Sequence, residues 1–203
     1  MGSRLTRILL VRHGQSTWNA DGRWQGRADP PLSELGRRQA EVAAETLEAE
    51  GITAVWASPL VRAHETAVIV ADRLGVMITF DPRLQERDAG EWTGKTRDEI
   101  EAGWPGFLAD GRRPDGFEVD EVLHDRALAA VHAIAVASGD EPVVVLSHGG
   151  LIRVVERALG SEPHSVPNLG GLDIRRVPSG LELAGRTVLI DAAAVTVTSP
   201  PEV

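Results

Sequence analysis

Short apolar runs alternate with longer stretches of helical periodicity through the first 160 residues, and this alternation constrains the fold most strongly. Four short apolar runs are expected to form strands: residues 8–11, 54–58, 76–80 and 142–147. Three stretches repeat apolar residues every three or four positions, as amphipathic helices do: residues 33–50, 59–75 and 123–139. Because parallel strands need long and usually helical connections, the pattern predicts a three-layer α/β/α fold with a mostly parallel central sheet.

Local signals refine this expectation. Ser58 followed by Pro59 predicts a helix start, and the spacing of Thr96 and Glu99 predicts a capping box at a short helix. Glycines, prolines and charges over 102–116 indicate a loop. After residue 160, three short pieces separated by turn residues predict antiparallel strands or hairpins: residues 172–177, 181–185 and 187–190.

Composition limits the class of protein. The 203 residues fit one domain over 1–203, with a catalytic core at about 7–198 and a frayed tail at 199–203. A net charge of -9 argues against nucleic-acid and membrane partners, because phosphate backbones attract clustered Lys and Arg. Without Cys, no thiolate chemistry is available, and a cytoplasmic location is expected. The first six residues match a lipidation pattern that is too short to predict a lipid.

Cationic side chains follow three of the predicted strands. Arg12 and His13 come directly after the first strand, Arg62 lies shortly after the second, and His148 follows the last of the four. Because ligands of such sheets bind beyond the carboxyl ends of the strands, we expect these side chains to meet. Gly149 would begin a helix there and add backbone N–H donors. In an acidic chain this cluster predicts a site for a compact anion such as a phosphoryl group.

Four sequence blocks together resemble the histidine phosphatase superfamily, the phosphoglycerate-mutase-like proteins. They are LLVRHGQSTWN (9–19), SPLVRAHETA (58–67), LQERDAGEWTG (84–94) and VVLSHGGLIR (144–153). The resemblance extends from about Ile8 to about Leu159 and implies the phosphoglycerate-mutase-like fold.

The resemblance implies roles for the cationic residues. His13 would be the nucleophile that becomes a phosphohistidine, which suits imidazole near neutral pH. A backbone carbonyl that accepts from its other ring nitrogen would select the tautomer. Arg12 and Arg62 would hold the phosphoryl oxygens through their planar guanidinium groups. His148 would donate to the same group as an imidazolium, and Gly14 would keep space free for it.

The resemblance also implies a general acid and further phosphate contacts. Glu86 would protonate the leaving alkoxide, with Asp88 as a less well placed alternative. Asn19 matches a phosphate contact of the family, and Gln25 and Gly26 are weaker candidates at the mouth of the site.

The remaining histidines and the tryptophans are interpreted as structural. His64, His124, His132 and His164 lack the spacing of metal ligands, so we predict no metal and no cofactor. Four tryptophans could border an organic substrate but are equally consistent with packing: Trp18, Trp24, Trp92 and Trp104.

The identity of the substrate rests on weaker signals. Arg112 and Arg113 are similar to the paired arginines that bind a carboxylate in the mutases, and they suggest a substrate with a second anionic group. Ala89 stands where mutases have a tyrosine. We therefore interpret the chain as a phosphomonoesterase that acts on a small phosphorylated metabolite. A cofactor-dependent phosphoglycerate mutase and a non-catalytic phosphate-binding module are the alternatives, and a homodimer is left open.

Overall fold

The computed structural model describes residues 6–191, so the expected tail at 199–203 and most of the lipidation pattern lie outside the described residues. The strands are β1 (Arg7–Arg12), β2 (Ala54–Ala57), β3 (Met77–Phe80), β4 (Val143–Ser147), β5 (Gly170–Val177) and β6 (Gly180–Val188). The α-helices are α1 (Thr17–Ala20), α2 (Glu34–Leu47), α3 (Val61–Leu74), α4 (Arg97–Gly103), α5 (Asp120–Ala137) and α6 (Gly149–Ala158). Short 3-10 helices are η1 (Glu48–Glu50), η2 (Pro82–Leu84) and η3 (Gly90–Trp92). None of the described helices combines the length and apolar character needed to cross a membrane.

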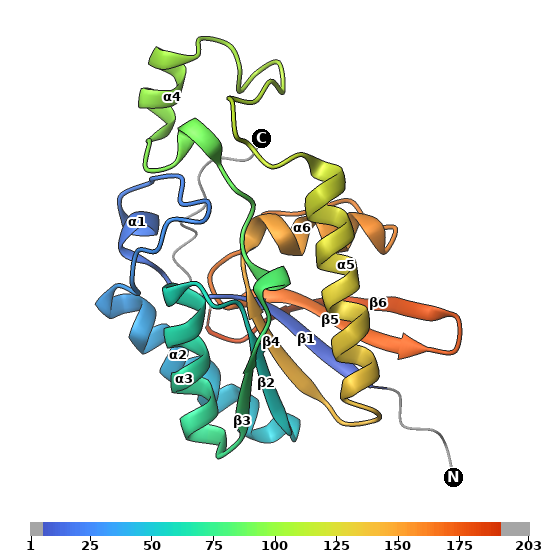
Figure 1. Cartoon of the computed structure of the whole chain (residues 1–203). Helices are drawn as coiled ribbons and strands as arrows, with labels where there is room; N and C mark the ends of the chain where they lie inside the picture. Colours follow the sequence, from blue (N-terminus) through green and yellow to red (C-terminus); the bar gives the residue numbers. More distant parts are fainter. Residues whose placement is uncertain (1–5, 192–203) are drawn as a thin grey trace.

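The strands form one sheet in the order β3-β2-β4-β1-β5-β6 (Figure 1). The first four in this order are parallel to one another, whereas β5 and β6 are antiparallel additions beside β1. Arg12 at the end of β1 lies opposite Ser147 at the end of β4. The register therefore brings together the two residues that come next, His13 and His148.

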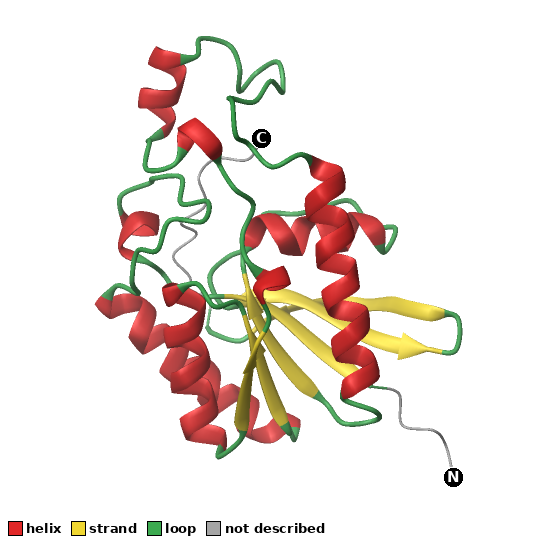
Figure 2. Ribbon diagram, viewed as in Figure 1, coloured by secondary structure: helices red, strands yellow, loops and turns green. Residues whose placement is uncertain are grey.

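Helices cover both faces of the sheet, which confirms the predicted three-layer fold (Figure 2). Leu9 and Val11 of β1 pack in one core with α2 and α3. Ile8 and Leu10 pack in the other core with α5 and α6. Successive side chains of a strand point to opposite faces, so a strand covered on both sides is apolar at every position.

Two local predictions need correction. Ser58 and Pro59 do not start α3, because Leu60 is its N-cap and the helix begins at Val61. The Oγ of Ser58 lies 2.8 Å from Nε2 of His148 instead. The two pieces expected at 181–185 and 187–190 are one strand, β6, because Gly185 continues in extended backbone opposite Asp173.

A cap of loops and short helices lies above the carboxyl ends of the parallel strands (Figure 1). Trp92 and Ile100 are fully buried in a small core of this cap, with Trp24 and Phe117 packed against it. Thr96 and Glu99 form the predicted capping box of α4. The cap supplies one wall of the site.

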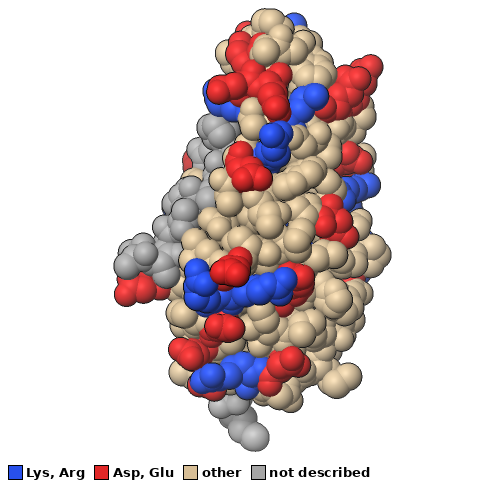
Figure 3. All heavy atoms as spheres, turned by 90° about the vertical axis from the view of Figure 1, so that its left-hand side faces the viewer, with Lys and Arg blue, Asp and Glu red and all other residues tan. Residues whose placement is uncertain are grey.

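Basic and acidic side chains lie beside one another on the face drawn in Figure 3. Arg73 pairs with Glu48 at 2.7 Å, and Arg37 pairs with Glu65 at 3.1 Å. Such a mixed face does not offer the clustered positive charge that a phosphate backbone attracts.

Two glycines allow the loop after β1 to pack against the start of α2. A Cβ on Gly14 would lie 2.5 Å from the carbonyl oxygen of Gly36, and a Cβ on Gly36 would lie 2.0 Å from that of Gln15. This contact gives Gly14 a reason that the sequence did not indicate, while the expected reason, space for the phosphoryl group, stays a prediction. This glycine is needed for close backbone packing beside His13.

Gly36→Ala should destabilise the protein by about 2 kcal/mol, because its methyl group meets backbone that cannot move aside locally. Gly103→Ala in α4 is the control, since nothing lies within 4 Å of the added Cβ. Urea unfolding of both variants tests this, and equal stabilities would contradict the packing.

Candidate active site

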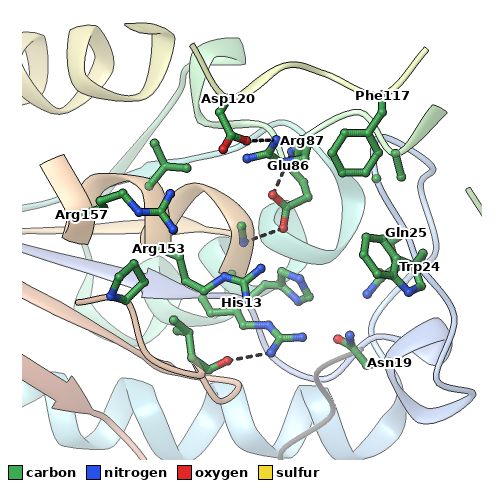
Figure 4. Close-up of a pocket in the computed structure, with 18 of the residues that line it drawn as sticks. His13, Asn19, Trp24, Gln25, Glu86, Arg87, Phe117, Asp120, Arg153 and Arg157 are labelled. Atoms are coloured by element: carbon green, nitrogen blue, oxygen red, sulfur yellow. Dashed lines mark hydrogen bonds and ion pairs between the residues drawn. The ribbon is translucent and has the colours of Figure 1, made fainter. Parts of the chain in front are cut away.

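A cavity of about 390 Å³ opens between the carboxyl ends of the strands and the cap (Figure 4). This volume falls within the range typical of small-molecule sites. The cavity brings together nine of the eleven predicted site residues: Arg12, His13, Asn19, Gln25, Gly26, Arg62, Glu86, Arg113 and Gly149.

His13 is held in one tautomer directly after β1. Its Nδ1 lies 2.6 Å from the carbonyl oxygen of Gly14, which can only accept, so Nδ1 carries the hydrogen. Its Nε2 is then unprotonated and accepts a hydrogen bond from Nε of Arg62 at 3.1 Å. A backbone carbonyl therefore selects the tautomer, as expected from the sequence, and the lone pair of Nε2 is the one that a nucleophile needs.

Burial keeps His13 neutral. The side chain is almost completely enclosed, and burial lowers the pKa of its imidazole well below 6.5. The positive charges of Arg62 and Arg12 lower the pKa further, because they oppose a third cation nearby. The attacking nitrogen is therefore available across the neutral and mildly acidic range.

Arg12 and Arg62 are buried cations. Nη1 of Arg12 donates to the carbonyl oxygen of Val166 at 2.7 Å. Arg62 donates to the carbonyl oxygens of Gly26 and Ala28 at 2.9 and 2.8 Å. Burial lowers the pKa of each guanidinium to about 10, so both remain charged at neutral pH.

His148 directly follows β4 and is the N-cap of α6. Burial, followed by the charge of Arg62, lowers the pKa of His148 well below 6.5, which favours the neutral ring over the imidazolium expected from the sequence. Its Nδ1 is buried and has no hydrogen-bond partner within the described residues. The ring centre lies 5.2 Å from that of His13.

Glu86 is held at the N-terminus of α6. One carboxylate oxygen accepts from the backbone N–H of Gly150 at 3.0 Å, and the other accepts from the N–H of Arg87 at 2.8 Å. A Cβ at position 150 would lie 2.5 Å from Oε1 of Glu86, so a larger residue there would displace this carboxylate. The carboxylate of Asp88 binds the N–H of Gly90 instead and does not line the cavity.

Arg126 supports the segment that carries Glu86, a role that the sequence did not indicate. It donates to the carbonyl oxygens of Gln85 and Glu86 at 2.6 and 3.1 Å. It also pairs with Glu118 at 2.8 Å. Only a cationic residue in the middle of α5 was visible in the sequence, without a signal for these partners.

Ser16 holds the two polar side chains of the opposite wall, Asn19 and Gln25. Oδ1 of Asn19 accepts from the N–H of Ser16 at 3.1 Å in the capping box of α1. Oε1 of Gln25 accepts from Oγ of Ser16 at 2.8 Å. Gly26 has a φ of 51° and approaches Ala89 so closely that a Cβ would lie 2.7 Å from its backbone nitrogen.

The predicted arginine pair is divided. Arg113 lines the cavity, with its guanidinium 5.3 Å from the ring centre of Phe117. Arg112 does not line it, because its side chain stacks on Phe107 at 4.1 Å and pairs with Asp110 at 2.8 Å.

Trp24 and Phe117 are the Trp and Phe side chains that line the cavity among residues 6–191. Trp24 is one of the four predicted tryptophans, and Phe117 was not predicted. Trp92 is buried in the cap core. Within residues 6–191, no group of three or more His, Asp or Glu side chains is placed to hold a metal ion.

Comparison with known proteins decides the family. Residues 8–173 match the histidine phosphatase superfamily (branch 1). The chain is a member of this superfamily. Glucosyl-3-phosphoglycerate phosphatase of Mycolicibacterium vanbaalenii is 39% identical over 197 residues, which cover 91% of this chain and 86% of that protein. The similarity to named phosphatases makes this histidine phosphatase a phosphoric monoester hydrolase.

Two further comparisons support the assignment. The structure of mycobacterial glucosyl-3-phosphoglycerate phosphatase with VO3 has a TM-score of 0.79 at 31% identity, with 90% of this chain and 99% of that chain covered. A probable phosphoglycerate mutase of Enterobacter sp. (strain 638) is 35% identical, with 94% of this chain and 98% of that protein covered.

Acid should destabilise this histidine phosphatase through His13 and His148. Below pH 6.5 the unfolded chain binds protons at both histidines while the folded chain does not. The free energy of unfolding should therefore fall by about 1.4 kcal/mol per pH unit for each histidine between about pH 6 and 5. Denaturant unfolding of the wild type and of His13→Gln/His148→Gln measures this dependence. Equal slopes for the two proteins would contradict it.

Proposed function

We propose that the protein hydrolyses a small phosphomonoester through a phosphohistidine formed at Nε2 of His13. One observation carries the proposal: the unprotonated Nε2 of a neutral His13 lies in the cavity, 3.1 Å from Nε of Arg62. A bound phosphoryl group would take over this donor and leave the lone pair of His13 free to attack.

In the first step, Nε2 of His13 forms a bond to phosphorus while the ester P–O bond breaks. Arg12 and Arg62 hold the phosphoryl oxygens, and Asn19 and His148 complete their surroundings. Glu86 in its protonated form gives its proton to the leaving oxygen. In the second step, water attacks phosphorus, Glu86 takes the proton of that water, and the N–P bond breaks to release inorganic phosphate.

Glucosyl-3-phosphoglycerate is the first substrate to test, because it gives its name to the M. vanbaalenii and mycobacterial relatives. A phosphoglycerate mutase is the second candidate, favoured by the name of the Enterobacter relative. A cytoplasmic location, independence from metal ions and a homodimer remain predictions of the sequence.

Product analysis separates hydrolysis from mutase activity. With glucosyl-3-phosphoglycerate or 3-phosphoglycerate supplied, hydrolysis should release inorganic phosphate, and 2-phosphoglycerate should not accumulate. NMR of the phosphorus nuclei follows all species at once. Accumulation of 2-phosphoglycerate would establish the mutase, and a lack of turnover with a panel of phosphomonoesters would overturn both candidates.

Glu86→Gln should separate substrates by their leaving group. Alkyl phosphates should lose on the order of 10³ in kcat/KM because their alkoxide needs a proton, whereas p-nitrophenyl phosphate should lose less than about tenfold. Asp88→Asn is the matched control, since that neighbouring carboxylate lies outside the cavity lining. Equal losses on both substrates for Glu86→Gln would assign the acid to another residue.

A further inference from the structure

The mouth of the cavity carries cations that the proposed mechanism does not use. Arg153 and Arg157 project from successive turns of α6, and Arg113 comes from the cap. In Figure 4, Arg153 and Arg157 lie on one side of His13, across from Trp24 and Gln25. Residues four apart on a helix lie on the same face, so the guanidinium groups of Arg153 and Arg157 lie on the same side of the cavity.

The side chains of the two α6 arginines form no hydrogen bonds or ion pairs with other described side chains or carbonyl groups. Arg87, the remaining arginine of the mouth, pairs with Asp120 and donates to the carbonyl oxygen of Glu118 at 2.9 Å. In contrast, the side chain of neither Arg153 nor Arg157 makes a hydrogen bond or ion pair to any residue in the described range 6–191. The charge of Arg157 reaches Asp120, whose pKa burial raises and Arg87 and then Arg157 lower. Arg153 is half-buried, so its charge is also partly removed from water.

The positive charge of Arg153 acts on two other arginines of the cavity, Arg12 and Arg113. It lowers the pKa of Arg12 in the phosphoryl cradle and the pKa of Arg113 in the mouth, in each case after the larger effect of burial. Six arginines line the cavity against three carboxylates, those of Glu86, Asp120 and Glu162. In a chain of net charge -9, this local excess is matched to a ligand with more than one anionic group.

We propose that Arg153 and Arg157 form a second anion site, which binds a carboxylate on the leaving group while Arg12 and Arg62 hold the phosphoryl group. This inference rests on the proposed phosphatase activity. In-line displacement sends the leaving group away from His13, toward Glu86 and the mouth. A carboxylate is planar and accepts two guanidinium donors, which two arginines one helical turn apart can supply. The site predicted from sequence at Arg112 and Arg113 is thereby moved to α6.

A matched pair of substrates tests the site. 3-Phosphoglycerate and glycerol 3-phosphate differ only in a carboxylate that is replaced by a neutral hydroxymethyl group. In Arg153→Gln/Arg157→Gln, the ratio of kcat/KM for 3-phosphoglycerate to that for glycerol 3-phosphate should fall about 50-fold, chiefly through KM.

The control is Arg38→Gln/Arg175→Gln, which removes the same charge at exposed positions outside the cavity and should leave the ratio unchanged. An unchanged ratio in the α6 variant, or an equal change in the control, would overturn the second site. Discrimination only against a substrate with a second phosphate, and not against the carboxylate, would overturn its assignment to carboxylates.

Binding keeps this test independent of catalysis. Calorimetric dissociation constants for the two compounds, measured with both double variants in a His13→Ala background that does not consume them, should show the same change in ratio. Tight and discriminating binding without turnover would overturn the proposed hydrolysis and leave the second anion site standing. Turnover without any preference for 3-phosphoglycerate over glycerol 3-phosphate would overturn the second anion site and leave the proposed hydrolysis standing.

Discussion

The hydrogen bond from Nδ1 of His13 to the carbonyl oxygen of Gly14 is the interaction on which the site depends. It leaves Nε2 as the unprotonated nitrogen, and this nitrogen accepts a hydrogen bond from Nε of Arg62. The carbonyl is in place because the loop after β1 packs against the start of α2 with almost no space between the two backbones. The close packing of these two backbone segments therefore determines which ring nitrogen of His13 is unprotonated.

Buried positive charge is the second constraint. Arg12 and Arg62 remain charged although burial lowers the pKa of each to about 10. Burial first, and then the charges of these two arginines, lower the pKa of His13 and of His148 well below 6.5. In the proposed mechanism, a phosphoryl dianion would favour the protonated form of His148, because opposite charges attract. The ring would then donate to the phosphoryl group only when that group is present.

The sequence predicted those parts of the fold and site that follow from order along the chain. Strands and helices alternate locally, so the layers were predictable, and His13 and His148 come directly after strands that pair in register. Contacts between distant segments were not predictable. The approach of Gly150 to Glu86, the support from Arg126 and the position of Arg153 depend on how α5, α6 and the cap pack. For the same reason, Arg112 and Arg113 could not be told apart by their position in the chain.

Trapping of the phosphoenzyme shows directly whether His13 is the residue that takes up the phosphoryl group. The protein is mixed with substrate, quenched within milliseconds at alkaline pH, where a phosphohistidine is preserved, and digested for mass spectrometry. We expect a phosphoryl group on His13 that forms and decays at rates compatible with turnover, and we expect His13→Ala to lose both this group and the activity. Phosphate on His148 or on another residue, or full turnover by His13→Ala, would contradict it.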